Sequence, residues 1–188
     1  MKALLSTFVF ILISIFAYPQ SVIVDKTTAD MRQILTNEVD WYGSGRDDMA
    51  SLCFYSTFGK EPTSFYVLDM NWDEDQTFRE GFKALFKHAS GDFTEITCFD
   101  GKGKSKLHYF PFPIVNINIH ALYYITEEQI AKIMTDPVVK IRIEYDKGYL
   151  DIDCGRKDGS SRFSDYVKKA VDVIETAKKN KTGLYDNF

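Results

Sequence analysis

The sequence predicts an α+β fold: mainly an antiparallel β-sheet arranged as a meander, with two C-terminal amphipathic helices packed on one face. Short apolar runs broken by turn residues follow one another through the first two thirds of the chain, whereas helical spacing is clear only in the last third. Aromatic residues make up 15% of the 188 residues. Such side chains favour pleated, half-buried strands, which supports a sheet rather than a helix bundle.

The overall composition excludes several classes of protein. Hydrophobic residues make up 45% and charged residues 27% of the chain, which is typical of a globular domain rather than a disordered, collagenous or multi-span membrane chain. The 23 Lys and Arg residues face 27 Asp and Glu residues, a net charge of −4. Because phosphate binding needs clustered cations, this balance argues against nucleic acid as a partner.

Residues 1–20 are predicted to be a signal peptide. Lys2 is followed by the uncharged residues 3–18, and Pro19 then discourages a helix. Such a helix would span about 24 Å, short of the roughly 30 Å hydrocarbon layer, which argues against an uncleaved anchor. We expect cleavage after Ala17 or Gln20, export to the periplasm or the medium, and no stable membrane span afterwards. Residues 21–188 then form a single α+β domain.

The strands expected before the helices are bounded by turn signals. Residues 43–48, 59–62, 90–92 and 100–103 are rich in Gly, Asp, Lys and Pro and are typical of hairpin turns. Residues 78–89 fit a helix or a strand, and we favour the strand because Gly81 weakens a helix. The other expected strands are residues 21–24, 31–41, 50–58, 64–70, 93–99 and 114–125.

The last third has the clearest local signals. Thr126 and Gln129 form a capping box that starts one helix, and Asp136-Pro137 ends it. Residues 139–145 alternate apolar and charged side chains, Gly148 closes a hairpin turn, and residues 149–154 return as the partner strand. A second amphipathic helix begins near Ser161.

This region also resembles the ending of small exported bacterial proteins of uncharacterised function. The resemblance rests on three runs and covers about a third of the mature chain. It implies a location in the envelope or outside the cell and carries no activity. The runs are Tyr124-Ile125-Thr126-Glu127-Glu128-Gln129-Ile130, Val139-Lys140-Ile141-Arg142-Ile143-Glu144 and Gly148-Tyr149-Leu150-Asp151.

Three cysteines, Cys53, Cys98 and Cys154, would meet an oxidising compartment after export. The odd number leaves at least one thiol unpaired within a monomer. One interpretation is three small buried apolar side chains. The other is a single disulfide, with Cys53 and Cys98 the most plausible pair because both fall in strand-like runs.

An acidic segment offers the best candidate metal ligands. Asp69, Asn71, Asp73, Asp75 and Glu80 fall at the oxygen-ligand positions of a calcium-loop pattern. Glu74, however, stands where the loop needs a glycine, and the preceding run reads as a strand. We therefore expect a solvated acidic turn, with at most a weak calcium site.

Dense aromatic clusters are the best candidate ligand-binding residues. Trp41, Tyr42, Tyr109 and Phe112 could stack on sugars or anchor a protein partner, and packing in the core or at an edge is the alternative. Pro111 and Pro113 place their stretch at an edge, a bulge or a loop.

Catalytic and cofactor motifs are weak. The sequence has no phosphate-binding loop, dinucleotide fingerprint or paired metal-binding histidines, so no cofactor is expected. Asp151 and Asp153 share one strand face, and Lys102, Lys104 and Lys106 are expected at a hairpin tip. We predict an exported, non-enzymatic domain that binds a protein or cell-envelope component. The alternatives are a carbohydrate- or small-ligand-binding module and, less favoured, an unidentified hydrolase.

Overall fold

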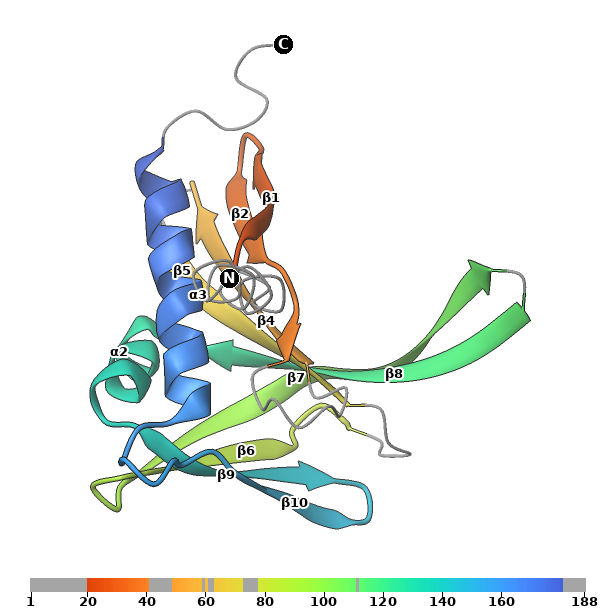
Figure 1. Cartoon of the computed structure of the whole chain (residues 1–188). Helices are drawn as coiled ribbons and strands as arrows, with labels where there is room; N and C mark the ends of the chain where they lie inside the picture. The colour runs from red at the N-terminus through yellow and green to blue at the C-terminus, as the bar shows by residue number, and fades with distance from the viewer. Residues whose placement is uncertain are drawn as a thin grey trace, which may run out of the picture.

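The computed structural model describes residues 20–40, 49–58, 60, 63–72, 78–110 and 112–180. In this part of the chain ten strands form one antiparallel sheet in the order β1-β2-β4-β5-β8-β7-β6-β9-β10, with β3 paired to β4. Two helices complete the fold (Figure 1). The elements are β1 Val22–Thr27, β2 Met31–Thr36, β3 Val39–Asp40, β4 Met49–Thr57, β5 Ser64–Trp72, β6 Lys83–His88, β7 Phe93–Phe110, β8 Phe112–Ile125, α2 Glu127–Thr135, β9 Val138–Tyr145, β10 Gly148–Asp153 and α3 Arg162–Lys179.

The predicted fold class is confirmed, with a strand order that departs from a simple meander. β5 pairs with β8 rather than with β6, and β9 joins the sheet beside β6. The ambiguous residues 78–89 contain a strand, β6, as expected. Most neighbouring strands are therefore consecutive in the chain, and the exceptions among the described strands are β2 with β4, β5 with β8 and β6 with β9.

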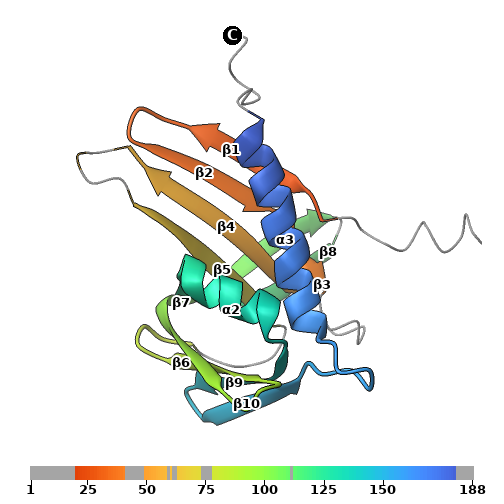
Figure 2. The ribbon, with the colours of Figure 1, turned by 90° about the vertical axis from the view of Figure 1, so that its left-hand side faces the viewer.

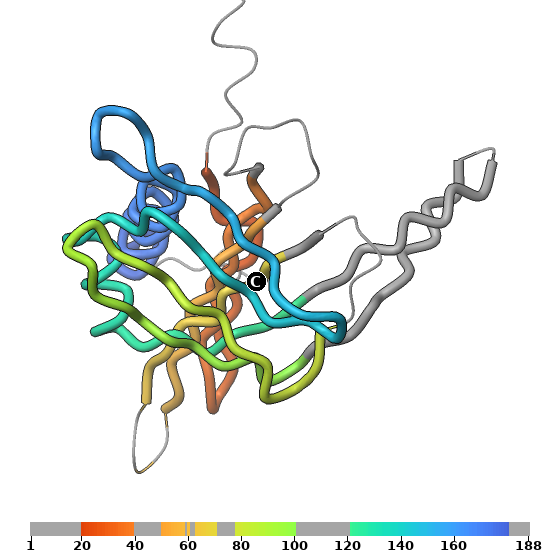
Figure 3. Tube along the Cα trace, turned by 90° about the horizontal axis from the view of Figure 1, so that it is seen from below, coloured from red at the N-terminus to blue at the C-terminus, as the bar shows by residue number. Residues whose placement is uncertain are grey.

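The long strand β7 joins two parts of the sheet. Its beginning pairs with β6, and from Cys98 onward it pairs with β8, with a register shift between Cys98 and Asp100. Such an irregularity bends a strand and increases its twist. Seen from below, β6, β9 and β10 cross the direction of β2 and β4 (Figure 3).

The hairpin turn predicted at residues 100–103 is wrong. β7 continues through it, and Gly101 and Gly103 pair with Ala121 and Ile119 of β8. Glycine and lysine are both compatible with an extended backbone, and the ladder to β8 satisfies the peptide groups of this stretch. Lys102, Lys104 and Lys106 therefore lie within a strand rather than at a hairpin tip. The ladder ends at the pair Phe110 and Phe112.

Both helices lie on one side of the sheet (Figure 2). The capping box of α2 is confirmed: the Gln129 N–H donates to Thr126 Oγ1 over 3.1 Å, and the Thr126 N–H donates to Gln129 Oε1 over 2.9 Å. Ser161 caps α3 by accepting the Ser164 N–H over 3.2 Å. α3 packs against β1, β2 and β4, while α2 packs against α3. Neither helix is long and apolar enough to cross a membrane.

The core fills the space between the sheet and the helices. The ring of Phe86 on β6 packs against that of Phe163 on α3, with centroids 5.1 Å apart. His88 is fully buried and structural, because its Nδ1 contacts Asp136 O at 2.7 Å and its Nε2 contacts Thr94 Oγ1 at 2.8 Å. The other end of α3 is held by Arg32, which donates to Ala177 O over 2.9 Å and pairs with Asp25 at 2.8 Å.

Candidate ligand-binding cavity on the outer face of the sheet

The central strands carry apolar side chains on both faces. On β4 and β5, residues such as Leu52 and Leu68 point toward α3 and are fully buried. Their neighbours Cys53 and Val67 point to the opposite face, because successive side chains of a strand alternate. We call the face toward α3 the inner face and the opposite one the outer face.

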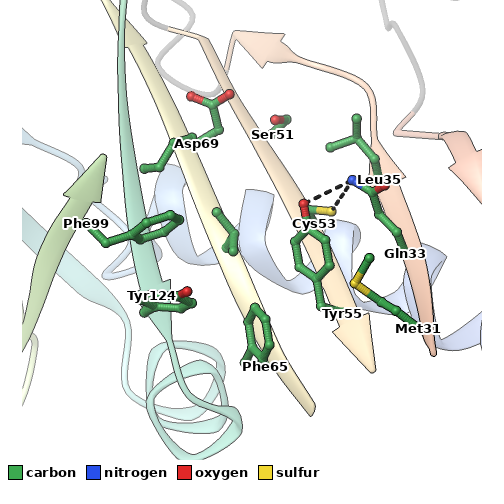
Figure 4. A pocket seen from close by; sticks show the side chains of 12 residues that line it. Met31, Gln33, Leu35, Ser51, Cys53, Tyr55, Phe65, Asp69, Phe99 and Tyr124 are labelled. Atoms are coloured by element: carbon green, nitrogen blue, oxygen red, sulfur yellow. Dashed lines mark hydrogen bonds between the residues drawn. The ribbon is translucent and has the colours of Figure 1, made fainter. Parts of the chain in front are cut away.

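A cavity of about 450 Å³ lies on the outer face. Figure 4 shows its side chains standing in front of the strands, with α3 behind them. Its lining comes from five strands, β2, β4, β5, β8 and β7, so no single segment creates it. The described lining residues are Met31, Gln33, Leu35, Ser51, Cys53, Tyr55, Phe65, Val67, Asp69, Phe99, Leu122 and Tyr124.

The size of the side chains explains why the outer face is hollow. Ser51 and Cys53 on β4 and Val67 on β5 are small and buried, and they form the floor. Larger side chains surround them on the neighbouring strands and further along the same strands. The step from small to large side chains makes a depression in the outer face.

Four aromatic rings form a row across four adjacent strands at one end of the cavity. Tyr55 on β4 stacks on Phe65 of β5 with centroids 5.2 Å apart. Phe65 and Tyr124 of β8 pack edge-to-face with centroids 5.3 Å apart, and Tyr124 stacks on Phe99 of β7 at 4.1 Å. The stacked pairs Tyr55–Phe65 and Phe99–Tyr124 cover part of each other's faces, and the row forms an apolar wall at this end of the cavity.

The polar groups gather at the other end and along one side. Ser51 and Asp69 are directly opposed in the pairing of β4 with β5. Gln33 Nε2 donates to Tyr55 Oη over 3.0 Å and contacts Cys53 Sγ at 3.6 Å (Figure 4). The cavity therefore has an aromatic end, where Gln33 and the Tyr55 hydroxyl add polar groups, and an opposite end with Ser51 and Asp69. The floor of Cys53 and Val67 lies between them.

The Cys53 thiol and the Tyr55 phenol stay neutral near pH 7. Burial raises the pKa of the Cys53 thiol above its ordinary value, and the hydrogen bond from Gln33 only partly offsets this. Burial likewise raises the pKa of Tyr55 to about 12. Among the twelve lining residues Asp69 is the one carboxylate, and none is Lys, Arg or His.

The described lining does not activate Cys53 as a nucleophile. A nucleophilic cysteine needs a lowered pKa and a neighbouring base or cation. Cys53 has a raised pKa, and the described lining offers it no histidine. An apolar cavity with a few polar groups at one end is instead typical of a site that orients a small ligand.

The side chains of the aromatic residues singled out from the sequence lie outside what the structure describes. Trp41 and Tyr42 lie outside the described residues. Tyr109 and Phe112 lie at the far end of the β7–β8 ladder, where they pair with Pro113 and Phe110, and their side chains lie outside what the structure describes. Their proposed role in binding stays a prediction.

The candidate metal ligands are not brought together within the described part of the chain. Asp69 and Asn71 belong to β5, whose backbone is paired on both sides, so this stretch is extended rather than curled into a loop. Asp73 and Asp75 lie outside the described residues, and Glu80 is exposed before β6. No group of three His, Cys, Asp or Glu side chains in the described residues is placed to hold a metal.

The disulfide considered between Cys53 and Cys98 is absent from this structure. All three cysteines are free and buried. Cys53 on β4 and Cys98 on β7 are separated by β5 and β8, a distance of about 14 Å at the usual strand spacing, which far exceeds the reach of a disulfide. They also lie on opposite faces, because Cys98 belongs to the inner core. The structure agrees with the other interpretation, in which the three cysteines are small buried side chains.

Sequence reasoning missed most residues of the aromatic row. From the sequence, Tyr124 stands out only in the run that carries the resemblance, and no binding role is predicted for Tyr55, Phe65 or Phe99. The available signal was the run Leu52-Cys53-Phe54-Tyr55 and its partner Phe65-Tyr66-Val67-Leu68, in which both alternating faces are apolar. Such strands must be covered on both sides or must bind something.

Comparisons with known proteins assign no family to the chain. No family model matches it, and no solved structure matches it. One curated protein that it resembles is a phosphoenolpyruvate-protein phosphotransferase from Mycoplasma pneumoniae, with 35% identity over 69 residues. The match covers 35% of this chain and 12% of the relative, so the likeness is partial.

Proposed function

We propose that this chain is a non-enzymatic domain that binds a small ligand in the cavity on its outer face. The observation that carries the proposal is the row of four rings from four strands beside a floor of small side chains. The cavity volume of about 450 Å³ falls in the range of small-molecule sites. This corresponds to the small-ligand alternative of the sequence analysis.

The shape of the site favours a small ligand over a protein partner. The floor residues Cys53 and Val67 are only 5% and 7% exposed, and a partner with a flat surface would leave such a depression unfilled. A ligand that enters it can bury its apolar surface on several strands at once. An envelope component of the size of a short lipid would fit the cavity. It would also agree with the prediction from the sequence that the domain binds a cell-envelope component.

Export remains part of the proposal. It rests on residues 1–20, of which 1–19 lie outside the described residues. N-terminal sequencing of protein recovered from the producing cells tests it, with Tyr18 or Ser21 expected as the first residue. A product that still begins at Met1 would contradict both cleavage and export by this route.

Ligand binding is tested with N-phenylnaphthylamine, a neutral apolar dye whose fluorescence rises when it leaves water. We expect saturable binding of one dye per chain, and at least a roughly tenfold weaker affinity in Phe65→Ala, because removing the ring costs more than about 1.4 kcal/mol of contact. The matched control is Phe93→Ala, which removes an aromatic ring that is 55% exposed on β7 and takes no part in the cavity.

Two outcomes would contradict the proposal. One is the absence of saturable dye binding to the folded protein. The other is equal affinity in Phe65→Ala and Phe93→Ala. Thermal unfolding of both variants is measured alongside, so that a loss of binding through loss of folding is recognised.

A further inference from the structure

Polarity falls from the β1 edge of the sheet to the middle of its outer face. The pairing of β1, β2 and β4 places Lys26 directly across from Gln33, and Gln33 directly across from Tyr55. Side chains of directly paired residues share one face of a sheet and lie about 5 Å apart at Cβ. The aromatic row begins at Tyr55 and continues over β5, β8 and β7. One line of side chains therefore runs from an ammonium group through an amide and a phenol to aromatic rings.

Lys26 supplies a cation that the protein itself does not use. Its side chain is exposed, and its ammonium group forms no ion pair or hydrogen bond with the described part of the chain. On the opposite face of the same strand, Asp25 is already paired with Arg32 at 2.8 Å. Because a lysine side chain is long and flexible, its ammonium group can reach over Gln33 to the rim of the cavity.

Two acids near the cavity lie further from Gln33 than this cation does. Asp30 is exposed in the turn three residues before Gln33, about 10 Å away along the chain. Asp69 pairs with Ser51, which is four residues from Tyr55 on β4, so Asp69 lies about 13 Å beyond the level of Gln33. Both distances exceed the Debye length of about 8 Å at physiological ionic strength. Asp69 also has an interaction within the protein, and the head position proposed below does not depend on it.

The rim beside Gln33 gives a ligand a way into the cavity. Met31, the neighbouring outer residue of β2, is 36% exposed, whereas the floor residues Cys53 and Val67 are 5% and 7% exposed. Cys53 and Val67 are directly paired, so a chain lying across them follows the aromatic row from strand to strand. The volume of about 450 Å³ corresponds to roughly 15 water volumes of about 30 Å³ each, which accommodates a tail of about ten carbon atoms.

We propose that the ligand is a single-chain amphiphile with an anionic head, bound across the strands with its head at Lys26 and its tail along the aromatic row. The head then stays at the rim in contact with water, which avoids the cost of burying a charge. At the same level the Tyr55 hydroxyl accepts from Gln33 and can donate its own proton to the head, because Cys53 Sγ beside it is only a weak acceptor. This inference rests on the proposed function and adds the class of ligand and its orientation.

Three ligands with the same tail test the inference: decanoate, decylamine and decanol, each below its micellar concentration at pH 7. They are measured by displacement of N-phenylnaphthylamine from the full mature chain. We expect decanoate to displace the dye at a concentration at least about threefold lower than decylamine, a modest factor because an ion pair at the rim is exposed to water. The preference should shrink as sodium chloride is added, because salt screens such pairs.

Reversing the charge of Lys26 should reverse this preference. In Lys26→Glu, decylamine should displace the dye at least about threefold better than decanoate, while the affinity for the uncharged decanol should change by less than about twofold. The matched control is Lys168→Glu, which makes the same change of charge at an exposed position on α3, on the helix side of the sheet. It should keep the preference of the native protein. Thermal unfolding of both variants confirms that each is folded.

The outcomes separate this inference from the proposed function. If the dye binds and Phe65→Ala weakens it, but decylamine competes as well as decanoate, the ligand class is wrong and the binding function stands. A preference for decanoate that persists in Lys26→Glu would overturn the head position, and would leave Lys26 only the role of keeping the edge strand β1 from pairing with other chains. If the dye does not bind at all, the proposed function itself fails.

Discussion

The inner and outer faces of β4 and β5 belong to the same strands, but only the inner face is packed into the core. On the inner face Leu52, Leu68 and Phe54 belong to the core on the helix side and are nearly inaccessible to solvent. On the outer face the apolar side chains surround a cavity. One apolar face is explained by folding alone. The second is not filled by the described residues, and an apolar surface of this kind commonly marks a binding site.

The largest effect that separates the two faces should come from neighbouring residues of β5. Leu68→Ala removes a fully buried inner side chain and should lower the free energy of unfolding by about 2–5 kcal/mol. Val67→Ala, one residue earlier on the outer face, should cost about 1 kcal/mol, because it only widens an existing cavity. Denaturant unfolding measures both, and similar losses would show that the outer face is packed like the inner one.

The next effect concerns the two directions of β2. Arg32 points to the inner side, where it pairs with Asp25 and donates to the last carbonyls of α3. Arg32→Ala should cost about 1–3 kcal/mol, since it leaves Asp25 and the helix end without these bonds. Gln33→Ala on the outer face should cost less than about 1 kcal/mol. Thermal unfolding of the two variants tests this, and a larger loss in Gln33→Ala would reverse the assignment of the faces.

The features that the sequence predicts well are those that depend on residues close together in the chain. In the last third, the caps of α2 and α3 and the alternation of β9 were readable because each depends on neighbours in the sequence. The pairing of β5 with β8 and the aromatic row depend on residues far apart in the chain, such as Phe65 and Tyr124. The turn predicted at Gly101 and Gly103 is wrong because pairing with β8 outweighs the local preference of glycine for turns.

A smaller effect is expected from a buried polar group at the inner face. The hydroxyl of Tyr123 is fully enclosed and has no hydrogen-bond partner among the described residues. Burial also raises the pKa of Tyr123 above its ordinary value, so the phenol stays neutral. Tyr123→Phe keeps the ring and removes the unpaired hydroxyl, and should raise the unfolding free energy by about 1 kcal/mol.

Calorimetry measures this as an increase of about 2–4 °C in the melting temperature. Tyr166→Phe is a useful companion, because the Tyr166 hydroxyl is also buried but has Thr36 and Gln20 as polar neighbours, so its removal should gain less stability. A loss of stability of 1 kcal/mol or more in Tyr123→Phe would show that a bound water or another group satisfies this hydroxyl.

The smallest effect lies on the β9–β10 hairpin, whose solvent-facing side carries charges instead of a cavity. Arg142 donates to both carboxylate oxygens of Asp151 over 2.7 and 2.8 Å, and Lys140 approaches at 2.9 Å. These bonds, those of Arg142 first, hold the pKa of Asp151 well below its usual range. A lowered folded-state pKa contributes stability above the unfolded value near 4 and loses it as the pH falls through the folded value.

Because the Asp151 side chain is 35% exposed, solvent screening should limit this contribution to about 0.5–1 kcal/mol. Unfolding free energies measured from pH 6 down to pH 2 should therefore fall slightly less in Asp151→Asn than in the native protein. The control is Asp30→Asn, which changes an exposed acid in the turn between β1 and β2. Parallel pH profiles for Asp151→Asn and the native protein would show that this charge cluster adds nothing, and that the buried inner side alone stabilises the hairpin.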